Sequence, residues 1–118
     1  MAREIPEPPE LHVTALSAEG VTVVAVAGEI DIATAGDFSA AVREHLGSGP
    51  VLLDLRKLTF MDSSGVRALD ALLGDVEREG WSFEIRSDMH ANVRQVLRLT
   101  GLLDALPLRE PPASAGSS

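Results

Sequence analysis

The chain has 118 residues, enough for one domain with a single hydrophobic core and too few for two ordinary domains. It contains no cysteine, which excludes disulfides and thiolate metal sites and favours a reducing compartment, so we expect it in the cytoplasm. Ten Lys and Arg against eighteen Asp and Glu give a formal net charge of -8, and the arginines are scattered, which argues against nucleic acid as a partner.

The two ends of the chain differ in composition from its centre. Residues 1–10 are rich in proline and charge instead of forming an apolar leader, and residues 109–118 are mostly small or polar. No apolar run approaches the roughly 20 residues that span a bilayer, so we expect no membrane partner. The composition predicts a flexible arm over 1–10, one ordered domain over 11–108 and a disordered tail over 109–118.

A hairpin is the first predicted element. Apolar and polar residues alternate over Leu11–Ala15, turn-forming residues follow over Ser17–Gly20, and a nearly continuous run of Val and Ala covers Val21–Ala27. Such a run is typical of a strand that is covered on both faces. After Gly28 the apolar period becomes helical, with inner positions at Phe38, Ala41, Val42, His45 and Leu46. We expect Thr34 to cap the start of this helix and Gly47 with Pro50 to end it.

Two further pairs of strand and helix follow along the chain. The run Val51–Leu55 predicts a buried strand, and helical spacing from Val66 predicts a second helix that ends at Gly80. A more exposed strand at Phe83–Ile85 precedes a third helix, whose expected inner positions are Val93, Val96 and Leu97. We expect Gly101 to be the C-terminal cap of this helix, with Leu102 or Leu103 folding back beneath it. This order of elements predicts an α/β domain with a mixed sheet.

The most informative segment is LLDLRKLTFMDSSGVRAL at Leu52–Leu69, where a buried strand leads into Asp-Ser-Ser-Gly directly before a helix. This segment resembles the signature of STAS domains of the anti-sigma factor antagonist family. The resemblance extends to GEIDIATAGDF at Gly28–Phe38 and to VRQVLRLTGLLDAL at Val93–Leu106, so it covers nearly all of the expected domain. It implies that residues 11–108 form a STAS-type mixed sheet of four or five strands with helices packed mainly on one face.

The resemblance also implies a function. In the family, the Ser or Thr directly after the Asp is phosphorylated by the anti-sigma factor, which is itself a serine kinase; by position that residue is Ser63. The chain is then expected to bind such a kinase, to release a sigma factor, and to be switched off by phosphorylation until a serine phosphatase restores it. It would be no enzyme and would need no cofactor, because ATP and Mg²⁺ belong to the kinase.

Five residues are the candidate partner-binding site: Asp31, Asp62, Ser63, Ser64 and Gly65. We expect the two aspartates to follow the carboxyl ends of neighbouring parallel strands, the edge where α/β sheets present ligands. Backbone N–H groups at the helix start would accommodate a phosphate on Ser63, while its charge beside Asp62 would repel a partner. Ser64 is a natural N-cap, and Gly65 would serve backbone geometry or close approach of the partner.

Arg67 departs from the small residue that the family more often has at this point of the helix start. It would change partner preference or pair with a phosphate on Ser63. The histidines, His12, His45 and His90, lie too far apart in sequence for a metal-binding spacing, so we expect no metal site.

Three other functions stay open. The first is a binding module outside sigma regulation, because STAS domains also serve in stress-sensing scaffolds and in lipid-transport assemblies. An enzyme would use Ser63 or Ser64 as nucleophile, which requires a base and an oxyanion site, but the sequence has no G-x-S-x-G motif and no obvious histidine partner. A nucleotide-binding regulator is the third, although neither a P-loop nor a dinucleotide-binding glycine loop is present.

Overall fold

A computed structural model of the chain describes residues 10–111. The expected arm over 1–10 and tail over 109–118 lie largely outside these residues. In chain order the described elements are β1 (Leu11–Ala18), β2 (Val21–Ile30), α1 (Ala35–Arg43), β3 (Val51–Met61), α2 (Ser63–Glu79), β4 (Phe83–Arg86), α3 (Ala91–Leu99), a 3-10 turn η1 (Leu103–Ala105) and β5 (Leu108–Arg109).

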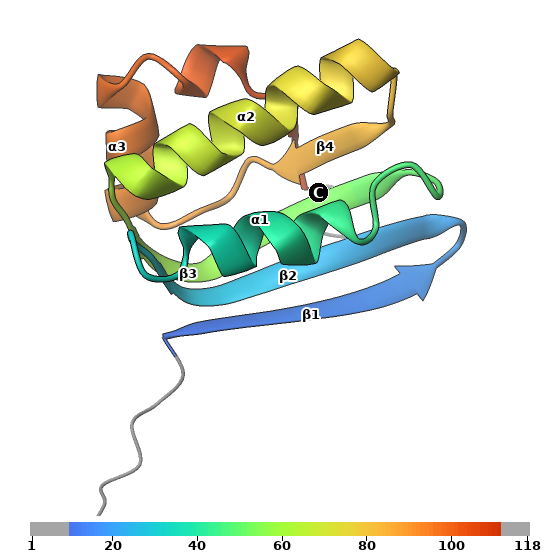
Figure 1. Cartoon of the computed structure of the whole chain (residues 1–118), viewed down its shortest axis with the longest axis horizontal. Helices are drawn as coiled ribbons and strands as arrows, with labels where there is room; N and C mark the ends of the chain where they lie inside the picture. Colours follow the sequence, from blue (N-terminus) through green and yellow to red (C-terminus); the bar gives the residue numbers. More distant parts are fainter. Residues whose placement is uncertain (1–9, 112–118) are drawn as a thin grey trace, which may run out of the picture.

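The five strands form one mixed sheet in the order β1-β2-β3-β4-β5. β1 pairs with β2 antiparallel, and every later pair is parallel. The α-helices lie over one face of this sheet (Figure 1). The predicted mixed sheet, with helices on one face, is therefore confirmed.

The hydrophobic core lies between the helices and the sheet. The amphipathic stripes of the helices point into it, as their sequence period predicts. Arg43 of α1 and Arg78 both pair with Asp75 of α2, so the two helices are also joined at their polar margin. Fully buried side chains come from every layer, including Val24, Phe38, Leu53, Leu69, Leu72, Ile85 and Leu97.

Three sequence predictions need correction. Only the helix-facing side of β2 is covered: Val24 and Val26 are buried, whereas Val23 and Ala25 on the other face are half-exposed. α1 ends at Arg43, before Gly47, and a turn then brings Leu46 into the core. β3 continues to Met61, six residues beyond the predicted end. The sequence pattern did not show this, because irregularities in the pairing of β3 with β2 interrupt the apolar alternation.

The turns lie close to the predicted positions but differ in detail. β1 runs to Ala18, so the hairpin turn consists of Glu19 and Gly20 alone, both with positive φ, and the C-cap of α3 is Thr100, one residue before the predicted Gly101. Gly101 follows α3 with a φ of 80°, and the N–H of Leu102 then bonds back to the carbonyl of Leu97 at 2.9 Å.

Within residues 10–111, no helix is both long enough and apolar enough to cross a membrane.

Candidate functional site

The candidate site lies at the carboxyl edge of the sheet, where β2 and β3 end together. Ile30 and Met61, the last residues of these parallel strands, are register partners. The N–H of Asp62 also donates a hydrogen bond to the carbonyl of Ile30 at 3.1 Å. Asp31 therefore begins the loop to α1 and Asp62 directly precedes α2 at the same edge, which is the placement expected from the sequence (Figure 1).

Asp62 is the N-cap of α2. Its backbone is extended, and its Oδ1 accepts hydrogen bonds from the N–H groups of Ser64 at 2.8 Å and Gly65 at 3.4 Å. A carboxylate here satisfies two unpaired N–H groups and interacts favourably with the positive end of the helix. The expectation that Ser64 caps the helix was wrong, because Asp62, two residues earlier, already occupies these donors.

Ser63 is the first residue of α2 and is exposed. Among residues 10–111 its hydroxyl has no hydrogen-bond partner, whereas Ser64 is half-buried. The expectation that backbone N–H groups are open to a phosphate needs refinement, because Asp62 already binds those of Ser64 and Gly65. A phosphate on Ser63 would share this helix start with the Asp62 carboxylate, so the two negative charges would repel each other.

Gly65 is buried where the first turn of α2 meets the sheet. A Cβ at this position would lie 2.6 Å from Cγ of Met61 and 2.9 Å from Cγ2 of Ile30. Gly65 therefore lets the helix start close against the ends of β2 and β3. Its backbone does not need the left-handed conformation, so the reason for glycine is packing within the chain and not loop geometry.

Asp31 builds the loop between β2 and α1. Its Oδ1 accepts hydrogen bonds from the N–H groups of Ala33 at 2.9 Å and Thr34 at 3.2 Å. Thr34 lies at the N-cap position, as predicted, but its hydroxyl makes no capping bond to the helix. That hydroxyl instead accepts from the Asp31 N–H at 2.9 Å and lies 3.0 Å from the carbonyl of Glu29, its acceptor. The half-buried Asp31 thus fixes the loop that carries it.

Two exposed residues flank these loops. Ile32 directly follows Asp31 and is 83% exposed, the most exposed large apolar side chain in the described part of the chain. Sequence reasoning missed it because it ended the second strand at Ala27, whereas β2 runs to Ile30, and no local pattern marks an apolar residue just beyond a strand as exposed. Arg67 is exposed one turn after Ser63 on α2, a spacing at which helical side chains are neighbours.

Two ion pairs lie on β3 and β4: one within β3, and one between the last residue of β4 and the loop that follows it. Arg56 binds Asp54, and Arg86 binds Asp88 through Nη2 and Oδ2 at 2.7 Å. The hydrogen bond from Arg86 is the main reason that the pKa of Asp88 is lowered to about 2. Within residues 10–111, no group of three His, Asp or Glu side chains is arranged to hold a metal ion.

Comparisons with known proteins agree with this geometry. The STAS domain model matches residues 12–115. A crystal structure of an anti-sigma factor antagonist from Mycobacterium paratuberculosis is 28% identical, with a TM-score of 0.74 over 92% of each chain. Two structures share the fold at lower identity. The anti-sigma factor antagonist SpoIIAA in its unphosphorylated form is 19% identical, with a TM-score of 0.66 over 86% of this chain and 90% of that chain. The Bacillus cell fate determinant SpoIIAA in its phosphorylated form is 18% identical, with a TM-score of 0.61 over 86% of this chain and 93% of that chain.

The family match therefore spans most of the sequence, and it includes both the β2 end with Asp31 and the β3 end with Asp62 and Ser63. The five-stranded mixed sheet, with its helices on one face, has the same overall fold as the structure from Mycobacterium paratuberculosis. The chain belongs to the STAS domain family.

Proposed function

We propose that the protein is an anti-sigma factor antagonist. In its unphosphorylated form it binds an anti-sigma factor serine kinase and so releases a sigma factor. Phosphorylation of Ser63 by the kinase ends this binding, and a serine phosphatase restores it. The observation that carries the proposal is the exposed Ser63 at the first position of α2, directly after the capping Asp62.

The partner surface would consist of the exposed groups at the carboxyl edge: Ile32 as an apolar contact, Ser63 at the helix start, and the free side of Asp31. A large apolar side chain that is 83% exposed gains much by being covered, and such anchors carry most of the binding energy in protein interfaces. Asp62 and Gly65 support this surface from within, because they hold the start of α2 in place.

Phosphorylation would act on docking and not on folding. The phosphate adds about -1.5 to -2 charge to an exposed side chain, and no packed group has to move to admit it. The positive helix end favours the added charge while the neighbouring Asp62 opposes it, so the net effect on the free energy of unfolding is small. A partner that buries this edge would instead have to desolvate two adjacent negative groups.

The names of relatives support the same proposal. The 28% identical structure from Mycobacterium paratuberculosis is an anti-sigma factor antagonist. A second antagonist with this fold, SpoIIAA, is known in both unphosphorylated and phosphorylated forms. A phosphate is therefore compatible with this architecture.

Phosphopeptide mass spectrometry tests the proposal. The protein is incubated with ATP, Mg²⁺ and an anti-sigma factor kinase isolated from its own cells, and we expect phosphate on Ser63 alone. The Ser63→Ala variant should remain unmodified, and the matched Ser64→Ala variant should be modified at the wild-type rate. Phosphate on Ser64, or equal modification of both variants, would sink the assignment of Ser63.

A second assay separates the regulator from a hydrolase that uses the same serine. Wild-type protein and the Ser63→Ala variant are incubated with chromogenic esters. The proposal expects no difference between them. Ester turnover that disappears in Ser63→Ala would favour the enzyme instead.

A further inference from the structure

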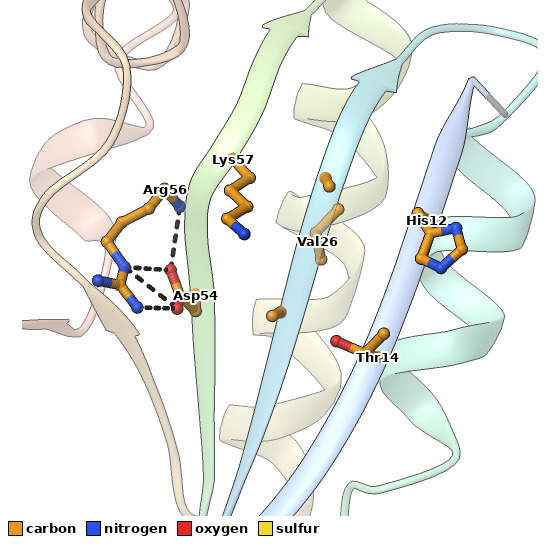
Figure 2. Close-up of a pocket in the computed structure, with 8 residues that line it drawn as sticks. His12, Thr14, Val26, Asp54, Arg56 and Lys57 are labelled. Carbon is orange, nitrogen blue, oxygen red and sulfur yellow. Dashed lines mark hydrogen bonds and ion pairs between the residues drawn. The ribbon is translucent and has the colours of Figure 1, made fainter. Parts of the chain in front are cut away.

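The face of the sheet opposite the helices carries a hollow of about 530 Å³ near its middle. Three neighbouring strands line it, and Figure 2 shows their side chains standing around it. The side chains that matter for the argument are His12 and Thr14 of β1, Ala25 and Ala27 of β2, and Asp54 and Lys57 of β3. This hollow is separate from the Ser63 edge, and nothing in the proposed partner switch uses it.

Side-chain size along three strands creates the hollow. Ala25 and Ala27 form a low floor on β2. On one side they pair in register with Thr14 and His12 of β1, and on the other side Lys57 is the partner of Ala27. Register partners point to the same face of a sheet. Side chains larger than alanine on both outer strands therefore stand beside two methyl groups, which leaves a depression between them.

An irregularity in β3 places Lys57 in this hollow. From Ala25 to Ala27, β2 advances two residues, while β3 advances three, from Asp54 to Lys57. Strict alternation along β3 would direct Lys57 to the face opposite that of Asp54, under the helices, where an unpaired ammonium is costly to bury. The extra residue restores Lys57 to the open face, a use of β-bulges that is common next to binding sites.

Lys57 carries the uncompensated charge of the hollow. Asp54 is already neutralised: its side chain is 9% exposed, Arg56 Nε donates to its Oδ1 at 3.0 Å, and Arg56 Nη2 donates to its Oδ2 at 2.8 Å. Among residues 10–111, no carboxylate forms an ion pair with Lys57. A free cation over an apolar floor, on a chain with net charge -8, is complementary to a small anion with an apolar body.

We infer that the hollow binds a small organic monocarboxylate, whose carboxylate pairs with Lys57 and whose hydrocarbon part lies on Ala25 and Ala27. The hydroxyl of Thr14 and the imidazole of His12 stand at the opposite wall and supply the remaining polar contacts. The charges around the hollow favour a monoanion. Arg56 also lines the hollow but is held by Asp54, so Lys57 would meet one charge of a phosphate dianion and leave the second without a partner.

Lys57 is the only lysine in the sequence, so lysine NMR signals report on this site alone. Full-length protein labelled with ¹³C and ¹⁵N in lysine alone gives a single set of side-chain NMR signals. Titration with hexanoate should move the Lys57 Cε and Hε signals to saturation, with a dissociation constant of about 1 mM or tighter. Hexylammonium should cause no saturable change, and hexyl phosphate should bind more weakly than hexanoate.

Hexanoate binding by the variants is followed through the backbone amide signals of residues 25 and 27. Lys57→Gln should weaken hexanoate binding at least about tenfold, as expected for the loss of a charged partner. Ala25→Leu should weaken it by filling the floor. The control Arg98→Gln removes an exposed positive charge from α3 and should leave the affinity unchanged. An unsaturable hexanoate response, equal binding by Lys57→Gln, or tighter binding of hexyl phosphate would overturn the inference.

Discussion

The N–H of Asp62 donates a hydrogen bond to the carbonyl oxygen of Ile30 at 3.1 Å, which ties the end of β3 to the end of β2. The loop that carries Asp31 and the start of α2, which carries Ser63, therefore begin from one fixed point of the backbone. The exposed side chains at this edge add little to that attachment. Substitutions of exposed side chains here should change partner binding, whereas substitutions of the supporting residues should change stability.

Gly65→Ala should lower the free energy of unfolding by about 1 to 3 kcal/mol, as overpacking of a dense core does. The added Cβ would meet Met61 and the β-branched Ile30, both buried and unable to move aside easily. Urea denaturation measures the effect. Gly74→Ala in the same helix is the control: a Cβ there meets nothing within 4 Å, so it should stabilise the protein by about 0.5 to 1 kcal/mol. Equal effects of the two substitutions would contradict the packing role of Gly65.

Two substitutions of Asp62, the N-cap of α2, separate the contribution of its hydrogen bonds from the contribution of its charge. Asp62→Ala should lower the free energy of unfolding by about 1 kcal/mol, because the N–H groups of Ser64 and Gly65 lose their acceptor. Asp62→Asn keeps an acceptor oxygen and should lose no more than about 0.5 kcal/mol, for the lost charge at the helix start. Thermal and urea unfolding of both variants measure this order. If Asn is as damaging as Ala, the capping role is wrong.

Ile32→Ser should leave stability within about 0.5 kcal/mol of wild type, because the side chain is 83% exposed. It should weaken binding to the anti-sigma factor about tenfold or more, the size expected for an apolar anchor in an interface. Leu16→Ser is the matched control, since Leu16 is 72% exposed near the β1–β2 turn, at the other end of β2. Calorimetric titration of the partner measures both. Equal affinities of the two variants would remove Ile32 from the interface.

The ion pair between Arg86 and Asp88 predicts a pH dependence. Pairing lowers the pKa of Asp88 from 3.8 to about 2, so its stabilisation is complete above the unfolded value and disappears as pH falls toward 2. Asp88 is 39% exposed, so screening limits the effect at neutral pH to about 1 kcal/mol. Unfolding of wild type and Asp88→Asn should differ at neutral pH and converge near pH 2. The exposed Asp104→Asn variant controls for the general loss of a carboxylate. A difference that persists unchanged at pH 2 would exclude this pair as its cause.

The helices and the paired strands were predictable because each has a clear apolar period. The α3 stripe, with Val93 and Leu97 at its centre, is buried as predicted. The far half of β3 was not predictable, because its extra residues put Arg56 and Lys57 side by side and break the alternation that marks a strand. No local pattern reports how a neighbouring strand shifts its register.

The candidate site was predictable in position but not in the role of each residue. Asp-Ser-Ser-Gly before a helix indicated a strand-to-helix turn, and the structure has Asp62 and Ser63 there. Which side chain caps the helix depends on backbone angles, so Asp62 could not be chosen over Ser64 from composition alone. The packing role of Gly65 depends on Ile30, a residue distant in sequence.

The central claim is that a phosphate on Ser63 prevents docking while the fold stays intact. Ser63→Glu and the phosphorylated protein are compared with Ser48→Glu, which adds the same charge as Ser63→Glu but in the exposed loop before β3. The eleven residues of β3 separate the two positions by roughly 30 Å. Ser48→Glu therefore controls for net charge without touching the carboxyl edge.

The most direct measurement is the affinity of phosphorylated protein for the anti-sigma factor, taken together with its thermal unfolding. The account predicts that phosphorylated protein binds the anti-sigma factor at least about tenfold more weakly than unphosphorylated protein. Its stability should change by no more than a typical surface substitution changes it, about 0.5 kcal/mol, and Ser48→Glu should bind with wild-type affinity. Phosphorylated protein that unfolds more easily yet binds its partner with undiminished affinity would contradict the account.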